Sequence, residues 1–125
     1  MDSISELKNM VAAFRDERDW KQYHNPKDLA ISISLEAAEL LEIFQWSGSD
    51  TEADTEHKMD KIREELADVF MYCLLMADRL DLDIGRIVTD KLAANRRKYP
   101  VEKAYGRADK YTAYMEMKTE GRQEK

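Results

Sequence analysis

The chain has 125 residues, 43% hydrophobic and 37% charged, with only four Gly and two Pro, a composition that favours one α-helical domain over an all-β one. Its formal net charge of −6 argues against binding nucleic acid polymers, because phosphate backbones attract basic surfaces. A single cysteine, no recognisable signal peptide and no apolar run of roughly 20 residues predict a cytoplasmic protein that does not enter membranes.

Apolar residues at helical spacing predict two helices in the first half of the chain. The first begins at a capping box between Ser3 and Glu6 and runs to about Trp20. Its packing face is predicted to consist of Ile4, Leu7, Val11 and Phe14. The second helix is capped by Asn25 and covers about residues 26–46. Because it is apolar on most sides, we expect it to be the central helix.

Two further helices are predicted in the second half of the chain. After a polar loop, the third covers about residues 55–80, and the fourth covers about residues 84–99, where Pro100 ends it. Four helices with short connections predict an all-α four-helix bundle, whose uncovered apolar sides favour oligomerisation. We expect this domain to span residues 1–112 and a polar C-terminal tail to follow at residues 113–125.

Two pairs of carboxylates interrupt the apolar pattern. Glu36 and Glu39 lie on the second predicted helix, and Glu65 and Asp68 lie on the third. Residues three apart share one face of a helix, and buried acids are unfavourable unless a positive charge neutralises them. Neither pair has a Lys or Arg placed to neutralise it from its own apolar stripe. If the two helices pack side by side, four carboxylates surround one small volume, and their oxygens favour a hard cation, Mg²⁺ or also Mn²⁺.

Other polar and aromatic residues are candidates for substrate contacts. Lys91 and Asn95 share a stripe of the fourth helix that could hold polyphosphate oxygens, whereas the alternative is a basic helix end that complements the helix dipole. Trp20 and Trp46 end the first two helices and are either core or interface residues or platforms for a base. His24 either contacts a phosphate or a base edge, or it is a capping or surface residue.

These carboxylates and their surroundings resemble a known family. The two motifs, ExxE followed by ExxD, resemble those of the MazG-like all-α nucleoside triphosphate pyrophosphohydrolases. Within this family, the dCTP pyrophosphatase branch is similar in the segments ERDWKQYHNPKDLAISISLEAAELLEIFQW and KLAANRRKYP. The similarity covers roughly residues 5–112. We therefore expect the fold of this family.

The resemblance also implies a function. It implies Mg²⁺-dependent hydrolysis between the α- and β-phosphates of a nucleoside triphosphate, dCTP or a modified dCTP, in nucleotide-pool sanitation. The four carboxylates would bind the metal and carry catalysis, with Glu39 as the first candidate to activate water. Relatives in this branch are homotetramers, dimers of dimers with sites completed across subunits. The family pattern assigns three residues to the base, Trp20, His24 and Trp46. It assigns three others to the sugar and phosphates, Tyr72, Lys91 and Asn95.

One departure from the family and two alternatives leave the substrate open. The segment LEAAELLE differs from the Gly-containing form of animal members. Because it retains both acids, the same catalysis is expected. The difference leaves the pocket shape and the base preference open. A pyrophosphohydrolase with a broad, dUTP or dTTP preference is one alternative. The other is a helical interaction module whose acidic cluster binds a structural cation.

Overall fold

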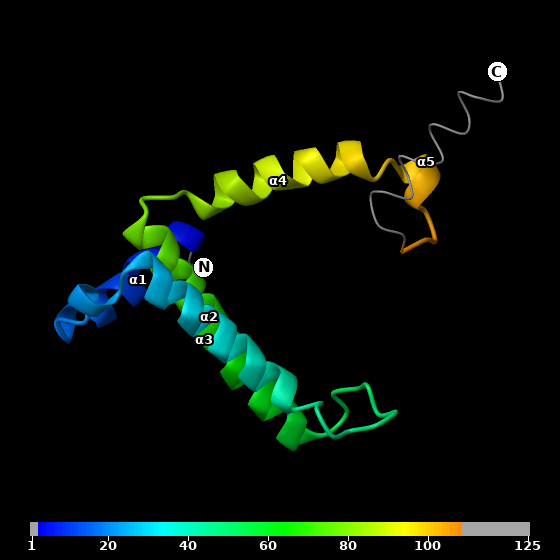
Figure 1. Ribbon diagram of the computed structural model, residues 1–125, viewed down its shortest axis with the longest axis horizontal. Coiled ribbons are helices and arrows are strands. Elements are labelled where there is room, and N and C mark those ends of the chain that lie inside the picture. The colour runs from blue at the N-terminus through cyan, green and yellow to red at the C-terminus, as the bar shows by residue number, and fades with distance from the viewer. Residues whose placement is uncertain (1–2, 109–125) are drawn as a thin grey trace. The chain divides into compact units, whose positions relative to one another are not determined.

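The computed structural model describes residues 3–108, and the chain divides after Ile84 into two units. All the secondary structure of these residues is helical, which confirms the all-α prediction. The first unit contains α1 (Ile4–Glu17), the 3₁₀ helix η1 (Lys21–Tyr23), α2 (Pro26–Glu42) and α3 (Glu56–Arg79) (Figure 1). The second unit begins in the first turn of α4 (Ile84–Lys98) and contains α5 (Val101–Ala104). The predicted tail at 113–125 and the predicted domain end at 112 lie outside the described residues.

The predicted helix starts are confirmed by their caps. The Ser3 hydroxyl accepts a hydrogen bond from the backbone N–H of Glu6 at 3.1 Å, and the Glu6 carboxylate accepts one from the backbone N–H of Ser3 at 3.3 Å. At the start of α2, Asn25 Oδ1 accepts from the N–H of Asp28 at 2.8 Å. Thr55 caps α3 in the same way. These bonds satisfy N–H groups that have no partner within the helix.

Helix α1 ends earlier than predicted, at Glu17 rather than at Trp20. Asp19 adopts a left-handed conformation with φ of 54°, which an aspartate tolerates better than most residues. The N–H of Trp20 then bonds to the carbonyl of Arg15 at 3.1 Å and closes the turn. Trp20 therefore lies in the connection between α1 and α2.

Helix α2 also ends earlier than predicted, at Glu42 rather than at Trp46. The N–H of Phe44 bonds to the carbonyl of Leu41 at 2.9 Å. The N–H and the hydroxyl of Ser47 both donate to the carbonyl of Phe44, at 3.2 and 3.0 Å. Bonds between residues three apart tighten the chain into successive turns. As a result Trp46 lies in a turn rather than on the helix.

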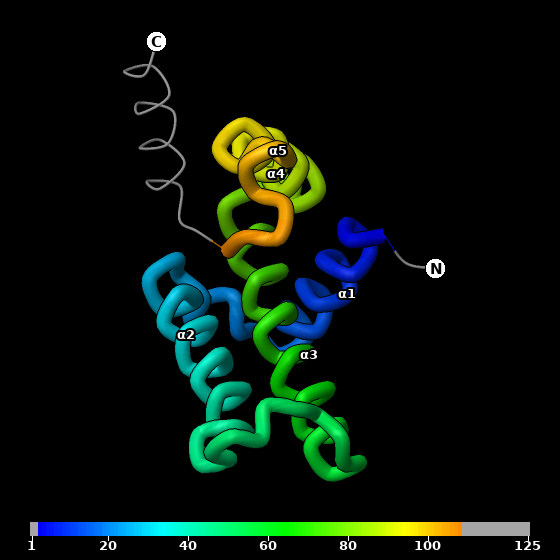
Figure 2. Tube along the Cα trace, turned by 90° about the vertical axis from the view of Figure 1, so that its right-hand side faces the viewer, coloured from blue at the N-terminus to red at the C-terminus, as the bar shows by residue number. Residues whose placement is uncertain are grey.

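Helix α3, rather than α2, is central in the first unit, because it packs against both α1 and α2 (Figure 2). Within the first unit, the expectation that the second helix is central is therefore wrong. α2 contributes only Leu29 to the buried residues, while its Leu35 and Leu41 are 61% and 65% exposed. The core of the described residues consists of Ala12, Leu29, Leu74, Leu75 and Ala77. One apolar face of α2 thus packs on α3, and the other is uncovered within residues 3–108.

The buried face of α1 is offset from the predicted apolar face. The predicted packing residues that remain more than one third exposed are Ile4, Leu7 and Phe14. Ala12 and Arg15 are buried instead. Arg15 Nη1 donates to Asp78 Oδ2 of α3 at 2.7 Å, and Arg15 Nε donates to Asp16 Oδ1 at 2.9 Å. This ion pair draws the polar side of α1 toward α3, which explains the offset.

The second unit agrees with the predicted fourth helix and adds a short one. α4 ends at Lys98, and Pro100 follows it as predicted. The Pro100 carbonyl also accepts hydrogen bonds from the N–H groups of Lys103 and Ala104, at 3.0 and 2.9 Å, which begins the unpredicted α5. The packing of α4 into a four-helix bundle stays a prediction. Across residues 3–108, no helix is both long and apolar enough to cross a membrane.

Candidate metal centre

Helices α2 and α3 lie side by side (Figures 1 and 2). The two carboxylate pairs, one on each helix, meet between them. Each residue of the cluster offers one oxygen, and these oxygens all lie within 4.8 Å of one another. The cluster consists of Glu36, Glu39, Glu65 and Asp68. Glu39 is the exposed member, and the other three are half-buried. The acids that the sequence singles out therefore surround one small volume, and their assignment as metal ligands stays a prediction.

The closeness of the carboxylates changes their protonation. A hydrogen bond with Glu39, together with burial and the nearby negative charges, raises the pKa of Glu65 from 4.5 to about 7. Burial, followed by the hydrogen bond and the charge of Glu39, raises the pKa of Glu36. The charge of Asp68 contributes to both shifts. Without a cation, the cluster thus retains a proton close to neutral pH.

The donor set fits a hard divalent cation. The Oε2 atoms of Glu36 and Glu65 are buried and have no hydrogen-bond partner among residues 3–108. Within residues 3–108, none of the four carboxylates forms an ion pair with a basic side chain. Buried carboxylate oxygens are costly unless they are paired, and carboxylates are the preferred ligands of Mg²⁺. A cation would therefore satisfy the orphaned oxygens and displace the shared proton.

The raised pKa of Glu65 predicts a pH dependence of stability. Between about pH 4.5 and about 7 the folded, metal-free protein binds more protons than the unfolded chain, so its free energy of unfolding falls as the pH rises. We expect Mg²⁺ to raise the melting temperature more at pH 8 than at pH 5, because the proton competes with the metal only at low pH. Thermal melts with Mg²⁺ and with EDTA measure this, and an equal Mg²⁺ effect at both pH values would contradict it.

Two of the predicted base contacts lie in the connection between α1 and α2. Trp20 is 45% exposed, and its ring meets the Phe14 ring edge to face with the centroids 5.9 Å apart. His24 is half-buried, and its buried Nδ1 atom has no hydrogen-bond partner in the described part of the chain. Burial, followed by the charge of Arg15, lowers the pKa of His24, so the ring is neutral at pH 7. A neutral imidazole can both donate and accept a hydrogen bond.

The other predicted substrate contacts lie on three different segments. Trp46 is 88% exposed in the turn after α2, and Tyr72 lies half-buried on α3, one turn beyond Asp68. On α4, Lys91 and Asn95 line one pocket of about 510 Å³. The same pocket is lined by the apolar residues Ile87, Val88 and Leu92. Within the second unit, Lys91 and Asn95 are thus brought together, and their contact with a substrate stays a prediction.

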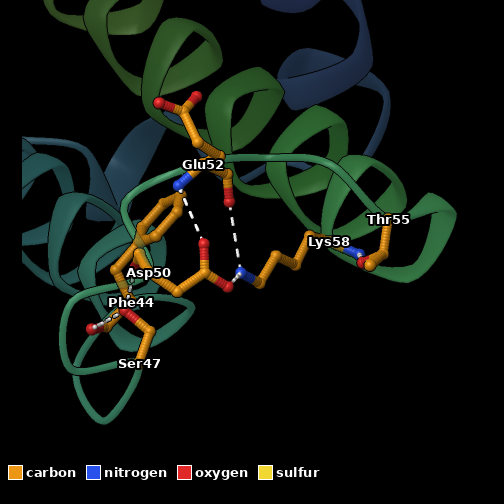
Figure 3. Close-up of polar contacts among 6 residues, drawn as sticks. All are labelled: Phe44, Ser47, Asp50, Glu52, Thr55 and Lys58. Atoms are coloured by element: carbon orange, nitrogen blue, oxygen red, sulfur yellow. Dashed lines mark hydrogen bonds and ion pairs between the residues drawn. The ribbon is translucent and has the colours of Figure 1, made fainter.

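A polar clamp that the sequence did not predict holds the loop between α2 and α3. Figure 3 shows the Lys58 ammonium group directed at the Asp50 carboxylate and at the backbone carbonyl of Glu52, 3.2 Å from the latter. The Ser47 hydroxyl lies within 2.6 Å of the Asp50 carbonyl and reinforces the loop. A lysine in the first turn of a helix after an acidic loop is the only sequence signal for this clamp, and it is a weak one.

The buried Arg15 was missed as well. It lies four residues after Val11, on the same side of α1 as a predicted packing residue, which is the signal that could have identified it. Arginine is rarely buried unless it is paired, so the partner must come from another helix. That partner, Asp78, is 63 residues away in the sequence.

An all-α fold in which two neighbouring helices combine four carboxylates defines a class of helical proteins with an acidic centre between two helices. Residues 31–113, more than half of the chain, match the MazG-like family. This range includes the whole acidic cluster and excludes Trp20 and His24. The chain belongs to the MazG-like family.

Individual relatives carry related names. The chain is 38% identical to the dCTP pyrophosphatase 1 of Rattus norvegicus over 114 residues, which cover 88% of this chain and 66% of the relative. The dCTP pyrophosphatase 1 of Homo sapiens is 34% identical with the same coverage. The solved structure of a pyrophosphatase from Archaeoglobus fulgidus is 39% identical, with a TM-score of 0.69, over 80% of this chain and 94% of that chain. The chain thus spans slightly less than two thirds of the length of the dCTP pyrophosphatases that it matches.

Proposed function

We propose that this chain is a nucleoside triphosphate pyrophosphohydrolase that uses Mg²⁺, or Mn²⁺ in its place, and acts on dCTP or a modified dCTP. The observation that carries the proposal is the four-carboxylate cluster in a member of the MazG-like family. The names of the relatives support both hydrolysis of a phosphoanhydride and a deoxycytidine substrate. We further propose a cytoplasmic role in cleaning the deoxynucleotide pool, based on the cysteine usage and the family resemblance.

In the proposed reaction, the four carboxylates hold the cation and Glu39 accepts a proton from the attacking water. The water oxygen forms a bond to the α-phosphorus, the bond from that phosphorus to the oxygen bridging to the β-phosphate breaks, and pyrophosphate leaves with the electron pair. Glu39 suits this role because it is the exposed member of the cluster and borders an open pocket. The chemistry that bound Mg²⁺ supplies is charge compensation at the phosphate oxygens.

Residues outside the cluster would bind the rest of the nucleotide. We propose that Trp20, His24 and Trp46 contact the base. The two tryptophan rings are exposed, and the buried Nδ1 atom of His24 has no hydrogen-bond partner in the described part of the chain. Lys91 and Asn95 would hold the phosphates, and Tyr72 would lie near the sugar. Lys91 and Asn95 lie one turn apart on the same face of α4, which supports their part of the assignment.

The dimensions of α2 support a site that is shared between chains. His24 lies two residues before this helix and Trp46 lies four residues after it, and the 17 residues of the helix span about 25 Å. A single base cannot contact side chains at both ends of that length, so a base site that uses both residues draws them from two chains. We propose a homotetramer, a dimer of dimers, that also covers the exposed apolar residues Leu35 and Leu41. A monomer mass by sedimentation equilibrium at micromolar concentration would contradict this.

A substrate panel tests the proposed function. We expect the purified protein to release pyrophosphate and dCMP from dCTP with Mg²⁺ and to lose this activity in EDTA. The control is the same panel with dUTP, dTTP and the ribonucleotides. Faster turnover of dUTP or dTTP than of dCTP would contradict the proposed base preference but would support the proposed reaction. A folded protein that turns over no nucleotide would leave the alternative of an interaction module with a structural cation.

A further inference from the structure

A pocket of about 340 Å³ opens beside one end of the acidic cluster. It is lined by Glu39 and Glu65, but not by Glu36 or Asp68, so it adjoins the end of the cluster nearest the loop between α2 and α3. Its volume is at the lower end of the range of roughly 300–1,000 Å³ for ligand pockets. The other residues that line it are Glu42, Ile43, His57, Lys58 and Lys61. The pocket therefore combines three carboxylates with two lysines and a histidine.

The two lysines of this pocket differ in their bonding. Lys58 is engaged, because its ammonium group pairs with Asp50 and donates to the Glu52 carbonyl (Figure 3). Lys61 is exposed and forms no hydrogen bond or ion pair with any residue between 3 and 108. It lies four residues before Glu65, on the same face of α3. Lys61 is thus the cation of this pocket that is free to meet a ligand.

The charges decide what kind of ligand suits Lys61. Divalent cations at the cluster first have to balance its own four carboxylates, so they leave much of the charge of a triphosphate uncompensated. An ammonium group at the edge of the cluster supplies that missing charge as a charge-assisted hydrogen bond. Because the pocket lies to one side of the cluster, a phosphate chain whose α-phosphate lies over the carboxylates would extend its terminal phosphates toward Lys61.

We propose that Lys61 binds the part of the substrate that leaves as pyrophosphate, and that the pocket beside Glu39 and Glu65 is the pyrophosphate subsite. This inference rests on the proposed function and adds a direction to it: the terminal phosphates lie toward the α2–α3 loop. A simpler role for Lys61 would be to neutralise the carboxylates. That role would affect metal affinity and would not distinguish pyrophosphate from a monophosphate.

Product binding tests the assignment. Isothermal titration with inorganic pyrophosphate and with dCMP, each at saturating Mg²⁺, should show that Lys61→Met weakens pyrophosphate binding about 10- to 100-fold. Binding of dCMP should stay within about twofold. Lys61→Arg, which keeps the charge, should retain most of the pyrophosphate affinity. The matched control is Arg63→Met on the same helix, since Arg63 points roughly 200° away and pairs with Asp60 at 3.0 Å.

The outcomes separate this inference from the proposed function. Unchanged pyrophosphate binding in Lys61→Met, or an equal loss of dCMP binding, overturns the subsite. An altered Mg²⁺ affinity with normal pyrophosphate binding also overturns it, in favour of the neutralising role. If the wild-type protein hydrolyses triphosphates in these cases, the proposed function still stands. A wild-type protein that neither hydrolyses triphosphates nor binds pyrophosphate overturns both.

Discussion

Asp68→Asn is expected to lower kcat/KM for the preferred triphosphate about a thousandfold, because the loss of one carboxylate from a metal centre removes several kcal/mol of transition-state stabilisation. The fold should persist. The negative charge of Asp68 raises the pKa of both Glu36 and Glu65, so its removal relieves repulsion in the metal-free protein. We therefore expect a melting temperature in EDTA at pH 8 that equals or exceeds that of the wild-type protein.

The matched control for this variant is Glu64→Gln. Glu64 is adjacent to Glu65 on α3, is exposed and is not part of the cluster, so the same acid-to-amide change should leave kcat/KM within about twofold. Initial rates of pyrophosphate release at several Mg²⁺ concentrations measure both variants. Near-normal activity of Asp68→Asn would show that the metal-site assignment is wrong.

Asp78→Ala is expected to destabilise the folded chain by about 3 kcal/mol, because it leaves a buried guanidinium without its partner on α3. The Arg15 side chain is 3% exposed and bonds Asp78 at 2.7 Å. The remaining partner, Asp16, is 55% exposed and lies on the same helix, so it cannot tie α1 to α3. Urea denaturation at a fixed protein concentration measures the loss, since oligomerisation would otherwise change the apparent stability.

A surface ion pair provides the comparison for Asp78→Ala. Asp60 pairs with Arg63 at 3.0 Å, but both side chains are more than half exposed, so Asp60→Ala should cost at most about 1 kcal/mol. The double variant Arg15→Met with Asp78→Leu should recover most of the stability, because well-packed apolar groups can replace a buried ion pair. Equal losses for Asp78→Ala and Asp60→Ala would show that the buried pair does not hold α1 on α3.

Local patterns predicted the helices better at their starts than at their ends. Ser3 and Asn25 reach N–H groups only three residues away, so their capping role can be recognised without knowledge of the rest of the fold. The ends of α1 and α2 depend on the left-handed Asp19 and on the turn bonds around Phe44. Trp20 and Trp46 fit the apolar helical pattern beyond these points, so the predicted helices were too long.

Within the site, the acidic pairs also show which features local patterns predict and which they do not. Helical spacing puts Glu36 with Glu39, and Glu65 with Asp68, on one face each, since residues three apart are neighbours on any helix. The cost of burying acids without partners then indicated a cation. The spacing could not indicate that Lys58 pairs with the α2–α3 loop while Lys61 stays free, because that depends on how the loop folds back onto α3.

The sequence by itself determined the all-α class, the helix starts and the side of each helix that carries its carboxylates, because all of these depend on interactions within about one helical turn. Only the tertiary structure decided that α3 is the central helix, that Arg15 is buried against Asp78 and that the two acidic pairs come within 4.8 Å. Each of these depends on which faces of distant segments pack together. That choice reflects the free energy of the whole arrangement and no single local pattern encodes it.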